Sequence, residues 1–152
     1  MNKVLTGLSV WTMFLFLMGM LFPIQTTNGA SSVGMVLQSY TIYGFFSLTP
    51  IVFYGSVVSF VSDWLAKRIN KYFHLYSFLF HVTAASLVYI VTKNIDVTIM
   101  AVLAAIMFFL ADRCFFLLSK APSVMTAHTL KNLPIVLGFV GVTAMVLGSA
   151  TG

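Results

Sequence analysis

Glutamate is absent from this sequence, and acidic residues of any kind are scarce. Three aspartates stand against eight lysines and arginines, and charged residues make up only 7% of the chain. A soluble globular domain carries about 25% charged residues, so this composition excludes a protein that faces water on all sides. Without glutamate and without two aspartates close in sequence, the pattern also argues against acid–base catalysis by a carboxylate pair.

Cysteine and catalytic motifs are scarce as well. Cys114 is the only cysteine, which excludes an intrachain disulfide, a zinc site of several thiolates and a CxxC redox pair. The sequence contains no glycine-rich phosphate loop, no GxSxG and no HExxH. It has no internal repeat and no linker, so we expect one domain over 1–152. We therefore expect no enzyme activity and no cofactor.

Hydrophobic residues are abundant, at 60% of the chain with a mean hydropathy of +1.02. They form five runs, each close to the roughly 20 residues that span a bilayer as a helix. The basic residues sit between these runs, which is typical of a membrane protein and not of a nucleic-acid-binding surface. The sequence predicts an all-α integral membrane helical bundle of about five transmembrane helices in a lipid bilayer. The predicted spans are 4–22, 41–61, 72–91, 97–118 and 133–150.

Three features of these runs affect the number and shape of the helices. If the first run is a cleaved signal peptide, four helices remain, although the poor cleavage site at 27–30 favours a retained helix. Pro50 lies within the second run and predicts a kink there. Asn132 is the predicted N-cap of the fifth run, with Pro134 in its first turn. The fifth run is the weakest span, because its core is short and holds three glycines.

The distribution of basic residues predicts the orientation of the helices. With the N-terminus inside, seven of the eight lysines and arginines fall on the cytoplasmic side, and only Lys93 falls outside. Because all loops are short, this is a strong positive-inside signal. It places the N-terminus and the basic segments 62–71 and 119–132 in the cytoplasm. The C-terminus is then outside, in a multi-pass protein of the cell membrane.

His81 lies near the midpoint of the third run. Polar side chains at this depth are costly in the bilayer, so they face the bundle interior and find a partner. With Ser56 and Ser59 of the preceding run, His81 forms a candidate intramembrane polar site, for which a proton relay, an ion ligand and a pH sensor are the functional interpretations. We favour a structural interpretation, because a relay lacks a second ionisable group at mid-membrane. The expected partner is a serine of the second helix.

A second group of candidate residues lies at the cytoplasmic ends of the second and fourth runs. Asp63 and Arg113 are expected at similar depth and are predicted to pair, with Asp112 meeting Lys67 or Arg68. Buried charges need such partners. This candidate cytoplasmic charge cluster is interpreted as a structural clamp, and the functional alternative is a cytoplasmic gate.

Small residues recur at helical spacing in several runs, which lets helix backbones approach closely. Gly55 and Ser59 form such a surface in the second run, and Gly138 and Gly141 form one in the fifth. We expect these faces to pack against other helices of the same chain. Self-association into a homo-oligomer, or packing against another membrane protein, is the further use of the same surfaces.

One pattern extends over three consecutive runs. It consists of FYGSVVSFVSD at 53–63, His81 in the next run, and FFLADR at 108–113 in the run after that. Over 54–113 it resembles small uncharacterised multi-pass membrane proteins of Gram-positive bacteria. That resemblance implies a membrane helical fold and no particular activity.

Two functions remain from the sequence. The first is a non-enzymatic accessory, regulatory or immunity-type protein that acts through helix packing with a membrane partner. The second is a small oligomeric transporter or channel that uses His81 and a serine-lined path. The first requires close-packing faces, which are present, and the second requires a continuous polar path.

Overall fold

The structure is a computed structural model that describes residues 3–24, 32–69, 72–119 and 124–150. Every regular element in these ranges is helical, and five helical segments are long and apolar enough to cross a membrane. The predicted all-α helical bundle is therefore confirmed. The elements are α1 (Lys3–Leu21), α2 (Ser32–Thr49), the π-helical turn η1 (Pro50–Tyr54), α3 (Gly55–Ile69), α4 (Phe73–Ser86), α5 (Val88–Thr92), α6 (Ile95–Ser119) and α7 (Val124–Ala150).

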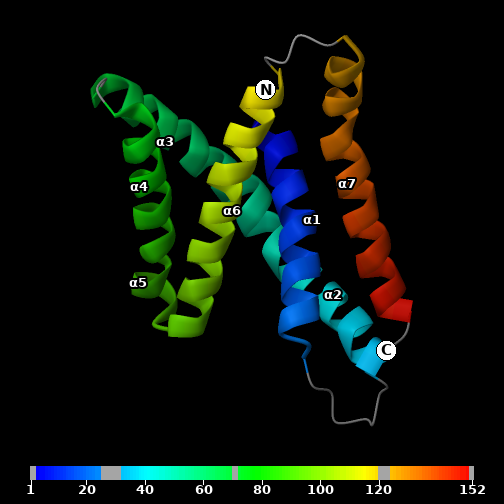
Figure 1. Cartoon of the computed structure of the whole chain (residues 1–152). Helices are drawn as coiled ribbons and strands as arrows, with labels where there is room; N and C mark the ends of the chain where they lie inside the picture. Colours follow the sequence, from blue (N-terminus) through cyan, green and yellow to red (C-terminus); the bar gives the residue numbers. More distant parts are fainter. Residues whose placement is uncertain (1–2, 25–31, 70–71, 120–123, 151–152) are drawn as a thin grey trace.

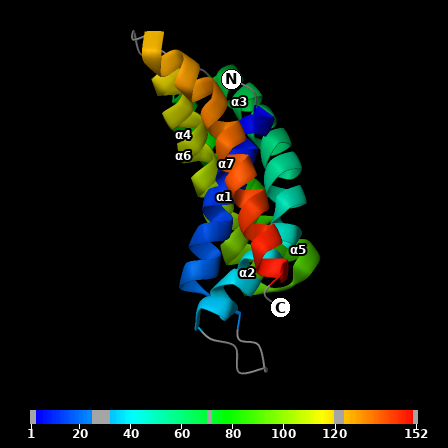
Figure 2. The same ribbon diagram turned by 90° about the vertical axis from the view of Figure 1, so that its right-hand side faces the viewer.

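Helix α1 is the central element of the bundle. In Figure 1 it lies between α7 on one side and α6 on the other, with α4 and α5 beyond α6, and the two chain ends lie at opposite ends of the molecule. Its sequence after Lys3 has no charged residue and no polar face, which is the pattern of a helix surrounded by other helices. Trp11 and Leu15 are fully buried accordingly. Figure 2 shows α7 running alongside α1.

The core forms where α1 meets its neighbours. The indole nitrogen of Trp11 donates to the carbonyl oxygen of Gly44 at 2.9 Å, which satisfies the polar end of this buried side chain. Apolar side chains from α1, α2, η1, α6 and α7 complete the cluster. They are Val10, Phe14, Leu15, Met18, Tyr40, Ile51, Val52, Phe108 and Ala144.

The second span is much longer than predicted. The expected helix 41–61 is part of a continuous helical stretch from Ser32 to Ile69. The residues between the first two predicted spans are therefore helical from position 32, and the predicted basic segment 62–71 is helical to position 69. The segment Val33–Ile69 has 37 residues, about 55 Å of helix against a hydrocarbon core of about 30 Å. The surplus is accommodated by an oblique course, visible as the diagonal of α2 and α3 in Figure 1.

Pro50 perturbs this long stretch without ending it. The predicted kink takes the form of the π-helical turn η1, in which the backbone N–H of Gly55 donates to the carbonyl of Pro50, five residues earlier. A π-helical turn inserts one extra residue into the helical ladder. The turn therefore sets the rotation of α3 relative to α2, and with it the direction in which the α3 side chains point.

Helices α5 and α6 meet in a tight connection. Lys93 adopts the left-handed conformation with φ of 51°, and its backbone N–H donates to the carbonyl of Tyr89, ending α5. The side-chain oxygen of Asn94 accepts from the N–H groups of Asp96 and Val97 at 2.8 and 3.2 Å. Asn94 thus caps α6, which begins at Ile95 and not at position 97 as predicted.

Helix α7 begins earlier than the sequence suggested. It starts at Val124, so the predicted loop 119–132 is helical from position 124, and Pro134 lies inside α7 instead of in its first turn. The interpretation of Asn132 as an N-cap is therefore wrong. Proline is tolerated inside membrane helices when the surroundings compensate for the lost hydrogen bond, and here Pro134 is fully buried.

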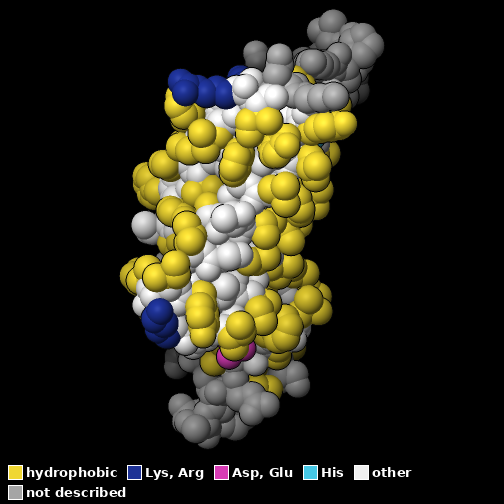
Figure 3. Space-filling view, turned by 90° about the vertical axis from the view of Figure 1, so that its left-hand side faces the viewer, with side chains coloured by type: hydrophobic (Ala, Val, Ile, Leu, Met, Phe, Trp, Pro, Cys, Tyr) yellow, Lys and Arg dark blue, Asp and Glu magenta, His cyan; other side chains and the backbone are white. Residues whose placement is uncertain are grey.

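The outer surface of the bundle is apolar over most of its height. Figure 3 shows a hydrophobic belt on the face that carries α4, with basic side chains near one end and both basic and acidic ones near the other. Exposed apolar side chains of the bundle include Leu79 on α4, Ile90 on α5 and Phe60 on α3. This surface and the five apolar helices fit a multi-pass membrane protein.

Candidate functional site

Four charged side chains from three helices meet at the end of the bundle where α1 begins. Nζ of Lys3 lies 2.7 Å from Oδ2 of Asp63 and 2.6 Å from Oδ2 of Asp112. Nη2 of Arg113 lies 2.6 Å from Oδ1 of Asp63. Two cations and two anions therefore neutralise one another, which lowers the cost of holding them mostly out of solvent. We call these four residues the charge cluster.

The cluster differs from the predicted one in one member, because Lys3 takes the place expected for Lys67 or Arg68. Asp63 and Arg113 pair as predicted, but Asp112 contacts Lys3 and neither Lys67 nor Arg68. Asp112, on α6, and Asp63, on α3, thus both contact the side chain of Lys3 at the start of α1.

Arg68 lies elsewhere, with its guanidinium 4.1 Å from the centre of the Trp64 ring. Sequence reasoning missed Lys3, although the charge distribution had already placed it on the same side of the membrane as Asp63 and Asp112.

Ser77 connects the charge cluster to α4. Its hydroxyl donates to Oδ1 of Asp63 at 2.8 Å and accepts from Nη2 of Arg113 at 3.0 Å. The Arg113 guanidinium also lies 4.8 Å from the ring centre of Phe73 and 5.2 Å from that of Phe109, within the range of cation–π attraction. Four helices, α1, α3, α4 and α6, are thus joined through one polar centre.

A cavity of about 470 Å³ lies against the charge cluster. Lys67 and His74 line it together with Lys3 and Arg113, beside the two aspartates and two phenylalanines. Lys67 and His74 are both exposed. We call this space the inner cavity. It is open at the end of the bundle, and the charge cluster lies at its base.

His81 is buried one helical turn from Ser77. It is 2% exposed, and its Nδ1 lies 2.7 Å from the backbone carbonyl oxygen of Ser77. The predicted partner, a serine of the preceding helix, is therefore wrong. A carbonyl four residues back along the same helix is already within reach and competes with any partner on another helix. The His81 ring packs against Phe109 at 5.8 Å between ring centres.

Ser56 and Ser59 do not join His81 in a hydrogen-bonded site. The Ser56 hydroxyl donates to the carbonyl oxygens of Val52 at 2.5 Å and Lys3 at 3.1 Å, so it faces α1. Ser59 is fully buried, and its hydroxyl has no hydrogen-bond partner among the described residues.

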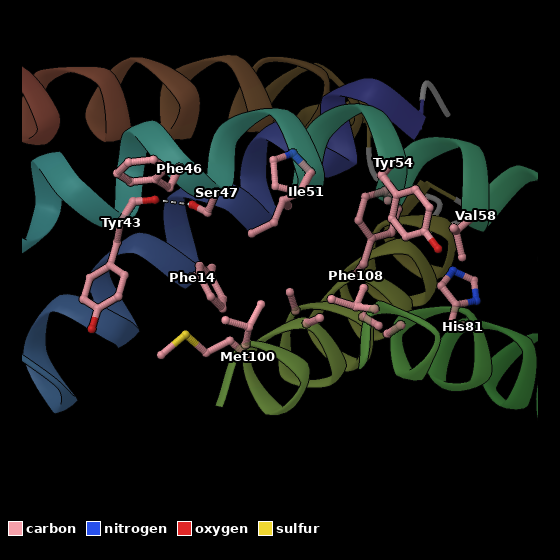
Figure 4. Close-up of a pocket in the computed structure, with 18 of the residues that line it drawn as sticks. Phe14, Tyr43, Phe46, Ser47, Ile51, Tyr54, Val58, His81, Met100 and Phe108 are labelled. Carbon is pink, nitrogen blue, oxygen red and sulfur yellow. Dashed lines mark hydrogen bonds between the residues drawn. The ribbon is translucent and has the colours of Figure 1, made fainter. Parts of the chain in front are cut away.

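A second cavity, of about 380 Å³, lies between α2–α3 on one side and α4–α6 on the other. We call it the lateral cavity, and Figure 4 shows its lining. Its wall is almost wholly apolar, with side chains such as Phe14, Ile51 and Met100. It opens sideways, because the lining residues Phe46, Tyr54 and Val97 are 74%, 48% and 41% exposed.

The hydroxyl groups on this wall are all engaged by backbone carbonyls. Tyr43 donates to Phe22 at 2.9 Å, Ser47 to Tyr43 at 2.5 Å, and Tyr54 to Ala84 at 3.1 Å. The predicted serine-lined path is therefore not what this cavity offers, because Ser47 turns back onto its own helix. His81 is the remaining polar residue of the lining.

The small-residue faces pack inside the chain. A Cβ added at Gly141 would lie 2.6 Å from Oγ1 of Thr12, and one at Gly138 would overlap Leu8. Thr12 also donates to the carbonyl of Leu137 at 2.8 Å, so α1 and α7 approach closely there. In the other predicted face, a Cβ at Gly55 would lie 2.9 Å from the Phe108 ring, while Ser59 is buried between helices.

Other chemistry is not indicated by the described residues. Among them, no three histidine, cysteine or acidic side chains gather as metal ligands. The chain matches no family model, no curated protein and no solved structure. The resemblance of 54–113 to small membrane proteins of Gram-positive bacteria stays a prediction, and the roles of these residues rest on their contacts.

Proposed function

We propose that this protein is a non-enzymatic accessory protein of the cell membrane that binds another membrane component in its lateral cavity. The observation that carries the proposal is the cavity itself, about 380 Å³ and open to the side of the bundle. Binding sites for small molecules are concave and mostly apolar, with a few polar groups. A site that opens toward lipid selects occupants that already reside in the bilayer.

The charge cluster supports this proposal as a clamp. The walls of the lateral cavity belong to two units, α2–α3 and α4–α6, and the ion pairs of Asp63 and Arg113 join these units at one end. Lys3 adds α1 to the same junction. Fixing the walls in advance reduces the ordering cost of binding, so the cluster keeps the cavity ready for its occupant.

The proposed orientation has the charge cluster at the cytoplasmic face. Lys3, Lys67, Arg68 and Arg113 all lie at or near that end of the bundle, and cytoplasmic segments are rich in such residues. The C-terminus then lies outside the cell, and the lateral cavity occupies the outer half of the membrane, beyond His81.

Site-directed photocrosslinking in intact membranes tests the proposal. A photoreactive amino acid replaces Ala101, which lines the lateral cavity, or Phe139, which is 71% exposed on α7. The expected result is a defined adduct at position 101 that differs from the bulk-phospholipid adducts at position 139. Adding Ala105→Phe, which fills the cavity, should remove that adduct. Identical products at both positions would contradict the proposal, as would an adduct that survives Ala105→Phe.

A small transporter is the second candidate function, and one observation favours it. Ser77 contacts His81 through its carbonyl oxygen and Asp63 through its hydroxyl. The lateral cavity reaches His81 and the inner cavity reaches Asp63, so Ser77 bridges the polar groups of the two cavities. In this reading the charge cluster is a gate and His81 a proton or ion carrier, in an oligomer of this chain.

A further inference from the structure

Among the residues that line the lateral cavity, one buried side-chain polar atom makes no hydrogen bond within the described part of the chain. It is Nε2 of His81, on a side chain that is 2% exposed. We propose that the lateral cavity binds a small lipid-soluble alcohol whose hydroxyl donates to this nitrogen. The inference rests on the proposed function and names the chemical class of its ligand.

The hydrogen bond made by the other ring nitrogen, Nδ1, determines whether Nε2 of His81 is a donor or an acceptor. The carbonyl oxygen of Ser77 can only accept a hydrogen bond, so Nδ1, at 2.7 Å from it, carries the proton and donates. A neutral imidazole has one protonated nitrogen, which leaves Nε2 as an acceptor. The complementary group on a ligand is therefore a donor such as a hydroxyl, and a ketone or an ether lacks it.

The other polar groups on the wall do not compete for that ligand. The hydroxyls of Tyr43, Ser47 and Tyr54 each donate to a backbone carbonyl. The rest of the lining is hydrocarbon and aromatic rings. A matching ligand has one donor group on an otherwise apolar body. The ligand must be small. Ligand-binding cavities have volumes of roughly 300–1,000 Å³, and the lateral cavity has about 380 Å³.

Tyr54 is the mobile neighbour that we expect to open a path to Nε2. Figure 4 shows Tyr54 and Val58 at the same end of the lateral cavity as His81. Nε2 is enclosed there, so a hydroxyl reaches it after a neighbouring side chain moves. The Tyr54 side chain is 48% exposed and is held by one bond of 3.1 Å to Ala84. Rotation of this ring toward the lipid opens the end of the cavity to the ligand.

A purely structural histidine is the competing explanation. Packing against Phe109 and bonding to the Ser77 carbonyl require only Nδ1 and the ring. A buried acceptor without a partner is unfavourable, and an apolar side chain at position 81 avoids it. A ligand hydroxyl at this site supplies the hydrogen-bond partner that the ring nitrogen facing away from Ser77 lacks.

The test compares two probes that differ by one donor. Purified protein in phosphatidylcholine–phosphatidylglycerol nanodiscs is photolabelled by a diazirine-bearing dodecanol, with 1-dodecanol or 1-methoxydodecane as competitor. We expect 1-dodecanol to compete about five- to tenfold better than the ether, the ratio expected for one hydrogen bond. Equal competition by the two probes overturns the inference.

Variants separate this inference from the proposed function. His81→Phe keeps an aromatic ring and should bring the two competitors to equal potency, while His74→Phe, at an exposed position outside the lateral cavity, should leave the ratio unchanged. If both competitors block labelling equally in the wild type, the cavity binds apolar molecules and only the alcohol assignment fails. If Ala105→Phe leaves labelling intact, the cavity is not the site and the proposed function fails too. The wild-type comparison decides the inference even if His81→Phe does not fold.

Discussion

Nζ of Lys3 lies 2.6 Å from Oδ2 of Asp112, although the two residues are 109 positions apart in the chain. The contact joins the first residue of α1 to the last third of α6. Lys3 holds Asp63 at the same time, and Asp63 in turn holds Arg113 and Ser77. The central helix is thus anchored directly to α3 and α6, and through Asp63 to α4, at the end of the bundle that we place in the cytoplasm.

Removing the carboxylate of Asp63 is expected to destabilise the bundle strongly. Asp63→Asn breaks two ion pairs at once and leaves Arg113 facing Ser77 and aromatic rings. Breaking one side of a buried pair costs about 3–5 kcal/mol. The free energy of unfolding is measured in mixed micelles. Asp96→Asn, at an exposed position, is the control and should change stability by only about 0.5 kcal/mol. Equal losses in both variants would show that the cluster is not a clamp.

The pairing partner of Asp112 can be identified by a double-mutant cycle. Lys3→Met and Asp112→Asn should be coupled by about 1–3 kcal/mol, because their charged groups are in direct contact. The same cycle with Lys67→Met and Asp112→Asn should give a coupling near zero. A larger coupling for Lys67 than for Lys3 would restore the pairing suggested by the sequence and reject the one in the structure.

The close approach of α3 and α6 makes Gly55 sensitive to size. Gly55→Leu places a side chain where a Cβ alone already lies 2.9 Å from the Phe108 ring. Overpacking of this kind costs about 1–3 kcal/mol, so we expect a lower unfolding free energy and less accumulation in the membrane. Val57→Leu, on the lipid-facing side with 61% exposure, should be tolerated. Similar tolerance at the two positions would remove the evidence for packing at Gly55.

The proposed orientation predicts which cysteines an impermeant reagent reaches. In a Cys114→Ala background, Asp96→Cys should be labelled from outside intact cells, because position 96 is exposed at the start of α6. Lys67→Cys, also exposed but near the charge cluster, should be labelled only after the cells are permeabilised. Labelling of position 67 in intact cells would contradict the proposed orientation and favour the opposite one.

The bundle itself was predictable because apolar runs and short loops report directly on bilayer crossing. The pairing of Asp63 with Arg113 followed from the same depth argument. The extent of the second span did not follow from the sequence, because polar residues beyond the predicted limits, such as Ser39 and Ser62, belong to the helix and are buried in the bundle.

The partners of the site were less accessible to sequence reasoning. Ser77 lies at the charge cluster because α3 and α4 pair with one particular register, and no local pattern encodes that register. His81 found a carbonyl on its own helix, where the sequence suggested a serine on another. The sequence predicted that Pro134 lies in the first turn of a helix, because proline fits that position. In the structure, α7 begins ten residues earlier, at Val124. The lateral cavity arises from how two units of the bundle meet, which only the assembled fold determines.

Proton flux in proteoliposomes tests the central claim, binding without transport, most directly. Purified wild-type protein and His81→Gln are reconstituted with a pH-sensitive dye inside, and a pH gradient is applied. We expect no flux above that of protein-free vesicles for either protein, because the wall hydroxyls of the lateral cavity are all engaged by carbonyls and the charge cluster closes the inner end. A wild-type flux that disappears in the folded His81→Gln variant would contradict this account and establish the transporter.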